Sequence, residues 1–306
     1  MIDVVLCADA NYARYGAAVM ASAMAHARFP GRLRFHLLTP GLSEDVQCRL
    51  HAMVEASGSS INIMTAEPEL PDGMALGRFG VSSLLPLYMH HYLPADCERV
   101  IYLDCDVVVL KDLAELWDTP LAGHTLAAAM DLCNPSNLHS RREPEHYFNT
   151  GVLLVDLPRW RAERVGESAL ACLKEEGASF KYPDQDALNH VLAGNWRRLS
   201  PAWNFQPTAY AAVEKRYPHL QPFRAELQAA IRSPGIVHFI GSTKPWHPAC
   251  VHPLQGLFLH FSRSTPWPIN DRELKSALPL TKRIRLAMKQ PRIRRRRTLT
   301  EYRKVG

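Results

Sequence analysis

The chain has 306 residues, of which 47% are hydrophobic and 22% are charged, which is ordinary for a folded globular protein. These values argue against a disordered or collagen-like chain, and seven scattered cysteines without a Cys-x-x-Cys pair argue against a disulfide-stapled miniprotein. No uninterrupted apolar stretch reaches about 18 residues, so we expect no membrane-spanning helix.

The net charge of +6 is unevenly distributed. Residues 282–306 hold eleven Lys or Arg and one acid, a net charge of +10. Residues 1–281 therefore carry 25 bases against 29 acids, a net charge of −4. The sequence predicts a mildly acidic body with a basic tail, so the positive total is a property of one segment only.

In chain order, predicted strands and helices alternate at the start of the sequence. We expect strands over six short apolar runs: Asp3–Ala8, Leu33–Thr39, Arg99–Leu103, Thr125–Met130, Gly151–Asp156 and Ile236–Ile240. Helical patterns cover Gly16–Arg28 and Ser43–Ala56, with Ser43 as a candidate N-cap. Unbroken apolar strands between helices predict an α/β fold with a mainly parallel sheet that is covered on both faces.

Ligands of such sheets bind beyond the carboxyl ends of the strands, so the polar residues that follow the apolar runs are candidates. Asp9 follows the first run and Asp131 follows Thr125–Met130, while Asp104 and Asp106 follow Arg99–Leu103. The Asp-x-Asp pair at 104–106 can hold one hard divalent cation that bridges to phosphate oxygens. The alternative is an Asp-rich turn after a strand. The pair is not unique, because Asp184-Gln185-Asp186 has the same form.

A second candidate segment runs from His238 to His247. A histidine at the end of a strand can complete a metal site, and the Gly241-Ser242 turn with Lys244 can bind phosphate. The alternative is a buried structural histidine followed by an ordinary turn.

Two further segments carry polar groups suited to a sugar. Asn149, before Gly151, can hydrogen-bond a hydroxyl while the glycine allows a close approach, although an Asn-containing turn is the simpler interpretation. Asp184 and Gln185 precede the helical pattern Ala187–Leu192, where Asp184 either caps the helix or points into a cleft.

Together these segments resemble glycosyltransferase family 8, and within it the bacterial lipooligosaccharide α-galactosyltransferases. Seven strings in register, over about residues 1–250, carry the resemblance. They are Ala8-Asp9-Ala10-Asn11-Tyr12, Val100 to Val107, Ala129-Met130-Asp131, Phe148 to Leu154, Tyr182 to Asp186, Asn204-Phe205-Gln206-Pro207-Thr208 and His238 to His247.

The resemblance implies a GT-A nucleotide-sugar fold over residues 1–265, a UDP-hexose donor (galactose or glucose), Mn²⁺ or Mg²⁺ as cofactor, and retention at the anomeric carbon. By position, the resemblance implies that uridine would contact Asp9, Asn11 and Tyr12, and that the cation would be held by Asp104, Asp106 and His238. The diphosphate would contact Gly241 and Lys244. The hexose would contact Asn149, Asp184 and Gln185, and the acceptor would contact Asp131, Tyr182 and Thr208. The candidate catalytic residues are Gln185, Asp184, Asp131 and Asn149. Because the Gln185 amide is a poor nucleophile, we expect same-face attack by the acceptor rather than a covalent intermediate.

One position departs from the family pattern. The family commonly has an arginine before the Asp-x-Asp strand that reaches the donor sugar, and the aligned residue here is Pro86. Proline has no backbone N–H to donate. The nearest basic residue in that segment is Arg78.

The segment 266–306 is a predicted membrane-association segment. Leu280, Ile284, Ala287 and Met288 recur at helical spacing between basic residues, and Pro291 should end the helix. Such a helix suits an anionic membrane surface, while a solubilising tail or a nucleic-acid contact are the alternatives.

We therefore expect a cytoplasmic enzyme, peripherally bound to the inner face of the cytoplasmic membrane, that transfers hexose from a UDP-sugar to a lipooligosaccharide or lipopolysaccharide glycan. No nucleic-acid partner is expected. The alternatives are a non-catalytic module that binds UDP and metal through the same fold, or a basic-tail scaffold whose motifs are coincidental.

Overall fold

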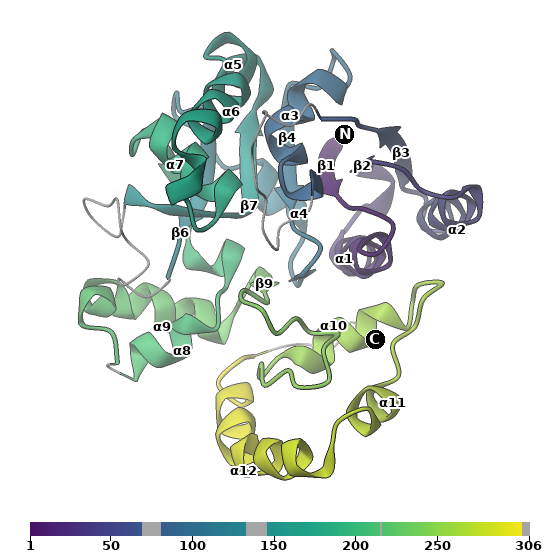
Figure 1. Cartoon of the computed structure of the whole chain (residues 1–306), viewed down its shortest axis with the longest axis vertical. Helices are drawn as coiled ribbons and strands as arrows, with labels where there is room; N and C mark the ends of the chain where they lie inside the picture. The colour runs from purple at the N-terminus through teal and green to yellow at the C-terminus, as the bar shows by residue number, and fades with distance from the viewer. Residues whose placement is uncertain (69–80, 133–145, 215, 302–306) are drawn as a thin grey trace.

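A seven-stranded sheet in the order β3-β2-β1-β4-β7-β6-β8 forms the centre of the molecule (Figure 1). The computed structural model describes residues 1–68, 81–132, 146–214 and 216–301. The strands of the sheet are β1 Ile2–Cys7, β2 Leu33–Thr39, β3 Ser60–Thr65, β4 Arg99–Leu103, β6 Leu126–Met130, β7 Phe148–Asp156 and β8 Arg197–Arg198. A separate pair consists of β5 Val107–Val109 and β9 Ile236–His238.

The prediction of a mainly parallel sheet is confirmed, with one strand reversed. β1 pairs in parallel with β2 and β4, β2 with β3, and β6 with β8, whereas β7 runs antiparallel to β4 and β6. The reversal has a consequence for function. The first residues of β7 lie at the same edge as the last residues of β1, β4 and β6.

Helices cover both faces of the sheet. The α-helices of the described residues are α1 Ala13–His26, α2 Glu44–Glu55, α3 Leu85–Tyr92, α4 Leu113–Trp117, α5 Leu157–Ala162, α6 Val165–Glu176, α7 Pro183–Leu192, α8 Thr208–Val213, α9 Arg224–Arg232, α10 Gln255–Ser262, α11 Asp271–Ser276 and α12 Leu280–Arg297, of which the last two bury no residue. Val4 and Leu6 of β1 pack in one core with α1, α2 and α8 to α10, and Val5 packs in the other with α3 and α5 to α7. Alternate residues of one strand thus enter opposite cores, which explains its unbroken apolar run.

The structure extends and corrects the element predictions. β3 escaped prediction because its sequence, Ser60-Ile61-Asn62-Ile63, alternates polar and apolar residues at the edge of the sheet instead of forming an apolar run. β7 begins at Phe148, three residues before the predicted start, and so includes the Asn149 segment. Ser43 does lie at the N-cap position of α2, but its side chain makes no capping hydrogen bond.

The expectation that Pro291 ends the C-terminal helix is wrong, because α12 continues to Arg297 with the proline inside. Proline removes only one hydrogen bond, the one to the carbonyl of residue 287. The next turn is held from outside: Arg292 and Arg296 both pair with Glu214, at 2.7 and 3.0 Å.

The first half of α12 presents its apolar side chains to solvent. Leu280, Ile284 and Met288 are 69%, 54% and 77% exposed. Figure 1 shows α8 to α12 together below the sheet, with α12 at the lower edge of the molecule. Among the residues that the structure describes, no helix is long and apolar enough to cross a membrane.

A buried ion pair joins the start of β1 to β2. Asp3 is 5% exposed and accepts hydrogen bonds from the Arg34 guanidinium and from His36 Nε2 at 2.8 Å. Burial alone would raise the pKa of Asp3, but its bonds to His36 and Arg34 outweigh burial and lower it from 3.8 to about 2. The carboxylate therefore contributes stability that is complete above pH 3.8 and lost as the pH falls through about 2.

Asp3→Asn should lower the free energy of unfolding near pH 7 by about 2 kcal/mol or more, and the pH-dependent part of this loss should shrink to about half by pH 3. Urea unfolding of both proteins at the two pH values measures the effect. Asp45→Asn, which removes an exposed carboxylate paired with Arg49, serves as the control and should change stability by less than about 0.5 kcal/mol. A difference between wild type and Asp3→Asn that is equal at both pH values would contradict the account.

Candidate active site

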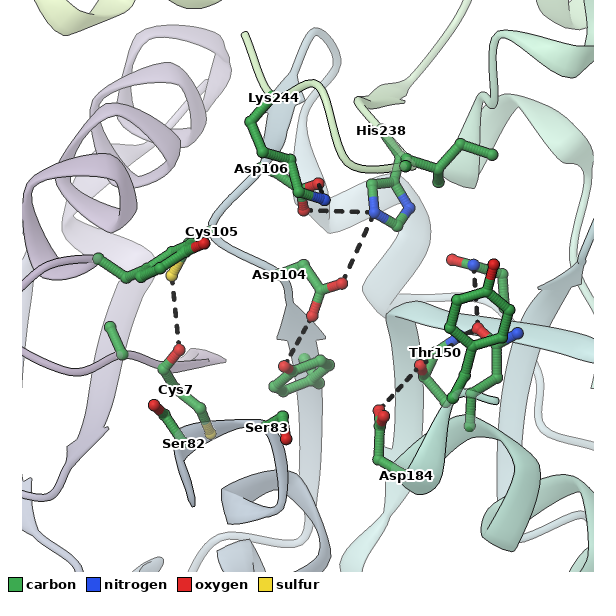
Figure 2. A pocket seen from close by; sticks show the side chains of 18 of the residues that line it. Cys7, Ser82, Ser83, Asp104, Cys105, Asp106, Thr150, Asp184, His238 and Lys244 are labelled. Carbon is green, nitrogen blue, oxygen red and sulfur yellow. Dashed lines mark hydrogen bonds and ion pairs between the residues drawn. The ribbon is translucent and has the colours of Figure 1, made fainter. Parts of the chain in front are cut away.

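A cavity of about 520 Å³ opens at the edge of the sheet where β1, β4 and β6 end and β7 begins (Figure 2). This volume is within the range of small-molecule sites. Twelve residues singled out in the sequence line it: Asp9, Tyr12, Asp104, Asp106, Asp131, Asn149, Tyr182, Asp184, Gln185, His238, Gly241 and Lys244. Asn11 and Thr208 do not. Asn11 is exposed on the turn before α1, and Thr208 begins α8.

A carboxylate–histidine cluster forms one wall of the cavity. His238 Nε2 lies 3.3 Å from Asp106 Oδ1 and 3.6 Å from Asp104 Oδ2, and Figure 2 shows the three side chains pointing toward one another. The pairing of β5 with β9 brings them together across 132 positions, because Val107 is opposite His238 and the Phe239 N–H donates to the Asp106 carbonyl.

Positive charge offsets part of the negative charge of the two carboxylates in this wall. Lys244 Nζ lies 2.5 Å from Asp106 Oδ2. Burial acts to raise the pKa of Asp106, but Lys244 and His238 outweigh it and lower the value well below the ordinary range. Burial and the neighbouring Asp106 raise the pKa of Asp104, against the charges of His238 and Lys244 and a hydrogen bond from the Tyr102 hydroxyl at 2.8 Å.

Asp184 faces the cluster from the first turn of α7. The N-cap interpretation of this residue is wrong, because Tyr182 occupies the cap position. Its carboxylate accepts a hydrogen bond from Thr150 Oγ1 at 3.1 Å and lines the cavity. Burial, reinforced by the negative charge of Asp104, raises its pKa to about 7.

Buried amides connect the opposite wall. Asn149 Nδ2 donates to Asp131 Oδ2 at 3.1 Å and to Gln185 Oε1 at 3.0 Å. Gln185 Nε2 donates in turn to Asp131 Oδ2 at 2.8 Å and to the Tyr147 hydroxyl at 3.0 Å. Both ends of the Gln185 amide are therefore held, which fixes the orientation of the group that faces the cavity.

Several residues at this site have roles that their sequence positions did not indicate. Thr150 and Asn204 occur within the matched strings, but a hydroxyl or amide carries no spacing signal that identifies its partner. Ser82 and Ser83 line the cavity beside α3, where Pro86 is buried, and the segment from 81 to 88 contains no basic residue. Arg78 lies outside the described residues.

The donor set of the cluster fits a divalent cation. One ligand atom from each of Asp104, Asp106 and His238 lies within 4.8 Å of the others. Two carboxylates and one imidazole suit Mn²⁺ and similar ions, which accept oxygen and nitrogen ligands. The Lys244 ammonium on the same carboxylate indicates that positive charge is required at this point.

The family model described as "Glycosyl transferase family 8" matches residues 3–250, which include both walls of the cavity. The chain belongs to glycosyl transferase family 8. Family membership and a cavity lined by polar groups identify it as a glycosyltransferase, in agreement with the resemblance of its motifs.

The chain is also similar to several named relatives. The chain is 27% identical over 280 residues to general stress protein A of Bacillus subtilis, covering 87% of this chain and 95% of that protein. It is 29% identical over 206 residues to the lipopolysaccharide 1,2-glucosyltransferase of Escherichia coli, covering 65% of this chain and 59% of that protein. It is 25% identical over 292 residues to the lipopolysaccharide 1,3-galactosyltransferase of Salmonella typhimurium, covering 88% of this chain and 82% of that protein.

A solved structure shares the architecture. The galactosyltransferase LgtC, in complex with donor and acceptor sugar analogs, superposes with a TM-score of 0.75 at 29% identity, covering 90% of this chain and all of that one. The GT-A fold expected from the motifs is therefore confirmed.

Gly151 is required by the packing of His238 against β7. A Cβ at this position would lie 2.2 Å from His238 Cε1 and 2.9 Å from Asp104 Oδ2. Such a contact is shorter than any side chain tolerates, so the imidazole ring can lie beside the carboxylates only if residue 151 has no side chain.

Gly151→Ala should displace the His238 ring and lower the free energy of unfolding by about 1–3 kcal/mol through overpacking. Thermal melting and a crystal structure of the variant measure both effects. Gly256→Ala in α10 is the matched control, because its added Cβ meets no heavy atom within 4 Å. An unmoved His238 ring in Gly151→Ala would refute the packing argument.

Proposed function

We propose that this glycosyltransferase transfers a neutral hexose, galactose or glucose, from a UDP-sugar to a lipopolysaccharide-type glycan with retention of configuration. The observation that carries the proposal is the cluster of Asp104, Asp106 and His238 beside Lys244, at the sheet edge where α/β folds bind nucleotides. The names of the Escherichia coli and Salmonella typhimurium relatives support this acceptor class.

In this proposal the UDP-sugar extends from Asp9 and Tyr12 past the carboxylate–histidine cluster to the opposite wall of the cavity. That wall, formed by the side chains of Asn149 and Gln185, is called the amide wall below. Tyr12 is 43% exposed and lies edge-on to Trp246, which is stacked on Tyr15 at 3.6 Å, so an aromatic surface is available to the base. The Asp9 carboxylate accepts the backbone N–H groups of residues 11 and 12, and this bonding shapes the turn before α1.

Asp104, Asp106 and His238 would hold Mn²⁺ or Mg²⁺, and the bound cation would supply Lewis-acid stabilisation to the departing diphosphate. Cleavage of the bond between the anomeric carbon and the phosphate oxygen leaves negative charge on UDP. Lys244 would move from Asp106 to a diphosphate oxygen, and the positive φ of Gly241, +95°, shapes the turn that precedes it.

The amide wall supports retention by same-face attack. The residue beside the predicted sugar position is Gln185, whose oxygen already accepts from Asn149 and from the Thr150 N–H at 3.2 Å. An amide held in this way orients the sugar and offers no carboxylate to form a glycosyl–enzyme bond. The acceptor hydroxyl would then attack on the face that UDP leaves, and its proton would pass to the departing phosphate oxygen.

The second candidate function is a non-catalytic module that binds UDP and a cation. Pro86 favours it, because the family's arginine at the donor sugar is missing from this position. Release of UDP from a panel of UDP-sugars, with Mn²⁺ and with EDTA, decides between the two. Slow, EDTA-sensitive hydrolysis of one donor supports the enzyme, and calorimetric binding of UDP without hydrolysis of any donor supports the module.

Asp104→Asn should lower Mn²⁺-dependent hydrolysis of the UDP-sugar by at least about a hundredfold, because it removes one of two charged ligands. The rate of UDP release at saturating Mn²⁺ measures the loss. Asp118→Asn, an exposed carboxylate after α4, is the control and should keep the wild-type rate. A wild-type rate in Asp104→Asn would overturn the cation assignment.

We also propose that α12 binds the anionic inner face of the cytoplasmic membrane, where a glycolipid acceptor would be found. Leu280, Ile284 and Met288 recur every four residues and are exposed, with Lys282, Arg283 and Arg285 between them and Lys289 directly after them. An apolar ridge flanked by basic side chains suits the headgroup region of such a leaflet. The contacts of Arg292 and Arg296 with Glu214 would hold this helix to the body.

Replacing Leu280, Ile284 and Met288 with serine should weaken binding to phosphatidylglycerol-containing vesicles by roughly tenfold or more, because the apolar area is lost while every charge remains. Cosedimentation measures this, and hydrolysis of the UDP-sugar in solution should stay at the wild-type rate. Phe29→Ser with Val251→Ser, exposed apolar residues outside α12, are the matched control. Unchanged vesicle binding of the triple variant would refute the proposal.

A further inference from the structure

A fully buried amide lies directly behind the cluster, outside the cavity lining. Asn204 ends the 3₁₀ turn Pro201–Asn204 and is 0% exposed. The backbone on its C-terminal side is attached to β9: the Phe205 N–H donates to the Ile236 carbonyl at 2.7 Å, and the His238 N–H donates to the Phe205 carbonyl at 2.9 Å. The Asn204 side chain is therefore held in a fixed place between His238 and Asn149.

The Gly151 backbone N–H allows the nitrogen and oxygen ends of the Asn149 and Asn204 amides to be assigned. The Gly151 backbone N–H can only donate, and it donates to Asn149 Oδ1 at 3.1 Å, which identifies that atom as the oxygen. The Asn204 atom 2.8 Å from the same oxygen must then be its NH₂ group. The other end of the Asn204 amide is consequently the oxygen, and it lies 2.9 Å from His238 Nδ1.

This arrangement determines the tautomer of His238. An amide oxygen accepts only from a protonated ring nitrogen, so Nδ1 carries a hydrogen, and whenever the ring is neutral its lone pair is at Nε2. Nε2 is the nitrogen that faces Asp104 and Asp106. The same Asn204 amide also orients Asn149, whose other end bonds Gln185 and Asp131 on the opposite wall.

We infer that Asn204 is a positioning residue that fixes His238 as the Nδ1–H tautomer, ready to bind a cation through Nε2, and links this ligand to the orientation of Asn149 on the sugar-facing wall. The inference rests on the proposed cation site. It adds a residue that touches neither the cation nor the substrate and acts through the two that do.

The test compares the Mn²⁺ affinity of two variants. Each protein is titrated with Mn²⁺ alone, and electron paramagnetic resonance measures how much of the ion is bound. Asn204→Leu removes both hydrogen bonds and should weaken Mn²⁺ binding roughly tenfold to a hundredfold, the range found for partners of metal-ligating histidines. Asn204→Asp keeps an acceptor for His238 Nδ1–H but cannot donate to Asn149. It should bind Mn²⁺ within about threefold of wild type while kcat for UDP-sugar hydrolysis falls.

Gln206→Leu is the matched control. Gln206 is also 0% exposed; its side chain donates to the Met130 carbonyl at 3.0 Å and accepts from the Leu132 N–H at 2.8 Å, so its hydrogen bonds go to the end of β6 and not to His238. Its loss should lower the melting temperature and leave Mn²⁺ affinity unchanged. If Asn204→Leu does not fold, Asn204→Ala replaces it with the same expectation.

Wild-type Mn²⁺ affinity in Asn204→Leu, equal losses in Asn204→Leu and Gln206→Leu, or an Asn204→Asp affinity as weak as that of Asn204→Leu would each overturn the inference. The proposed cation site fails by a different result. In that case wild type and Asp104→Asn would show the same Mn²⁺ affinity, or wild type would bind none.

Discussion

The concentration of negative charge at one edge of the sheet is the constraint on which the site depends. Asp104, Asp106 and Asp184 approach one another in a cavity where water cannot fully solvate them, so each raises the cost of ionising the next. Lys244 and His238 offset part of this cost, which is why Asp106 stays ionised while the pKa values of Asp104 and Asp184 rise. The cation proposed for this site would offset the remaining repulsion, and its charge would in turn attract a diphosphate.

Keeping His238 beside the carboxylates restricts the neighbouring positions. Residue 151 must lack a side chain, and the amides of Asn149 and Asn204 must keep one orientation. A side chain at residue 151 would displace His238 from the carboxylates, and an unheld His238 could present either ring nitrogen to them. Asn204 and Asn149 are buried polar groups whose donors and acceptors are paired with protein atoms. Burying such amides is costly unless every bond is made, so the network permits essentially one geometry.

The two halves of α12 differ in their contacts: the C-terminal half is attached to the body of the protein, and the N-terminal half is exposed. The Glu214 carboxylate holds the last turns of α12, and the Tyr210 hydroxyl lies 3.2 Å from the hydroxyl of Thr300, three residues after the helix. Its first half has no buried residue and leaves apolar and basic side chains outward. In the proposed membrane association, this surface would place the cavity near the bilayer without inserting a helix through it.

The sequence by itself determined the six strands that form apolar runs and the candidate residues, because both depend on local order. The run Arg99–Leu103 was predicted with its exact bounds, since a strand buried on both faces must be continuously apolar, and the acids that follow it had to lie at the sheet's carboxyl edge. Twelve of the fourteen residues assigned to the site line the cavity, whereas Asn11 and Thr208 do not.

Only the tertiary structure decided which of these residues meet, and in what orientation. The reversal of β7 brings Asn149 to the edge where the parallel strands end, and the pairing of β5 with β9 sets His238 against Asp106. The sequence could not give the continuation of α12 past Pro291 either, because it depends on Glu214 far away in the chain. Asn204 stands in a matched string, but its role could not be predicted, because an amide acts through its partners and hydrogen-bond partners distant in sequence are fixed only when the chain has folded.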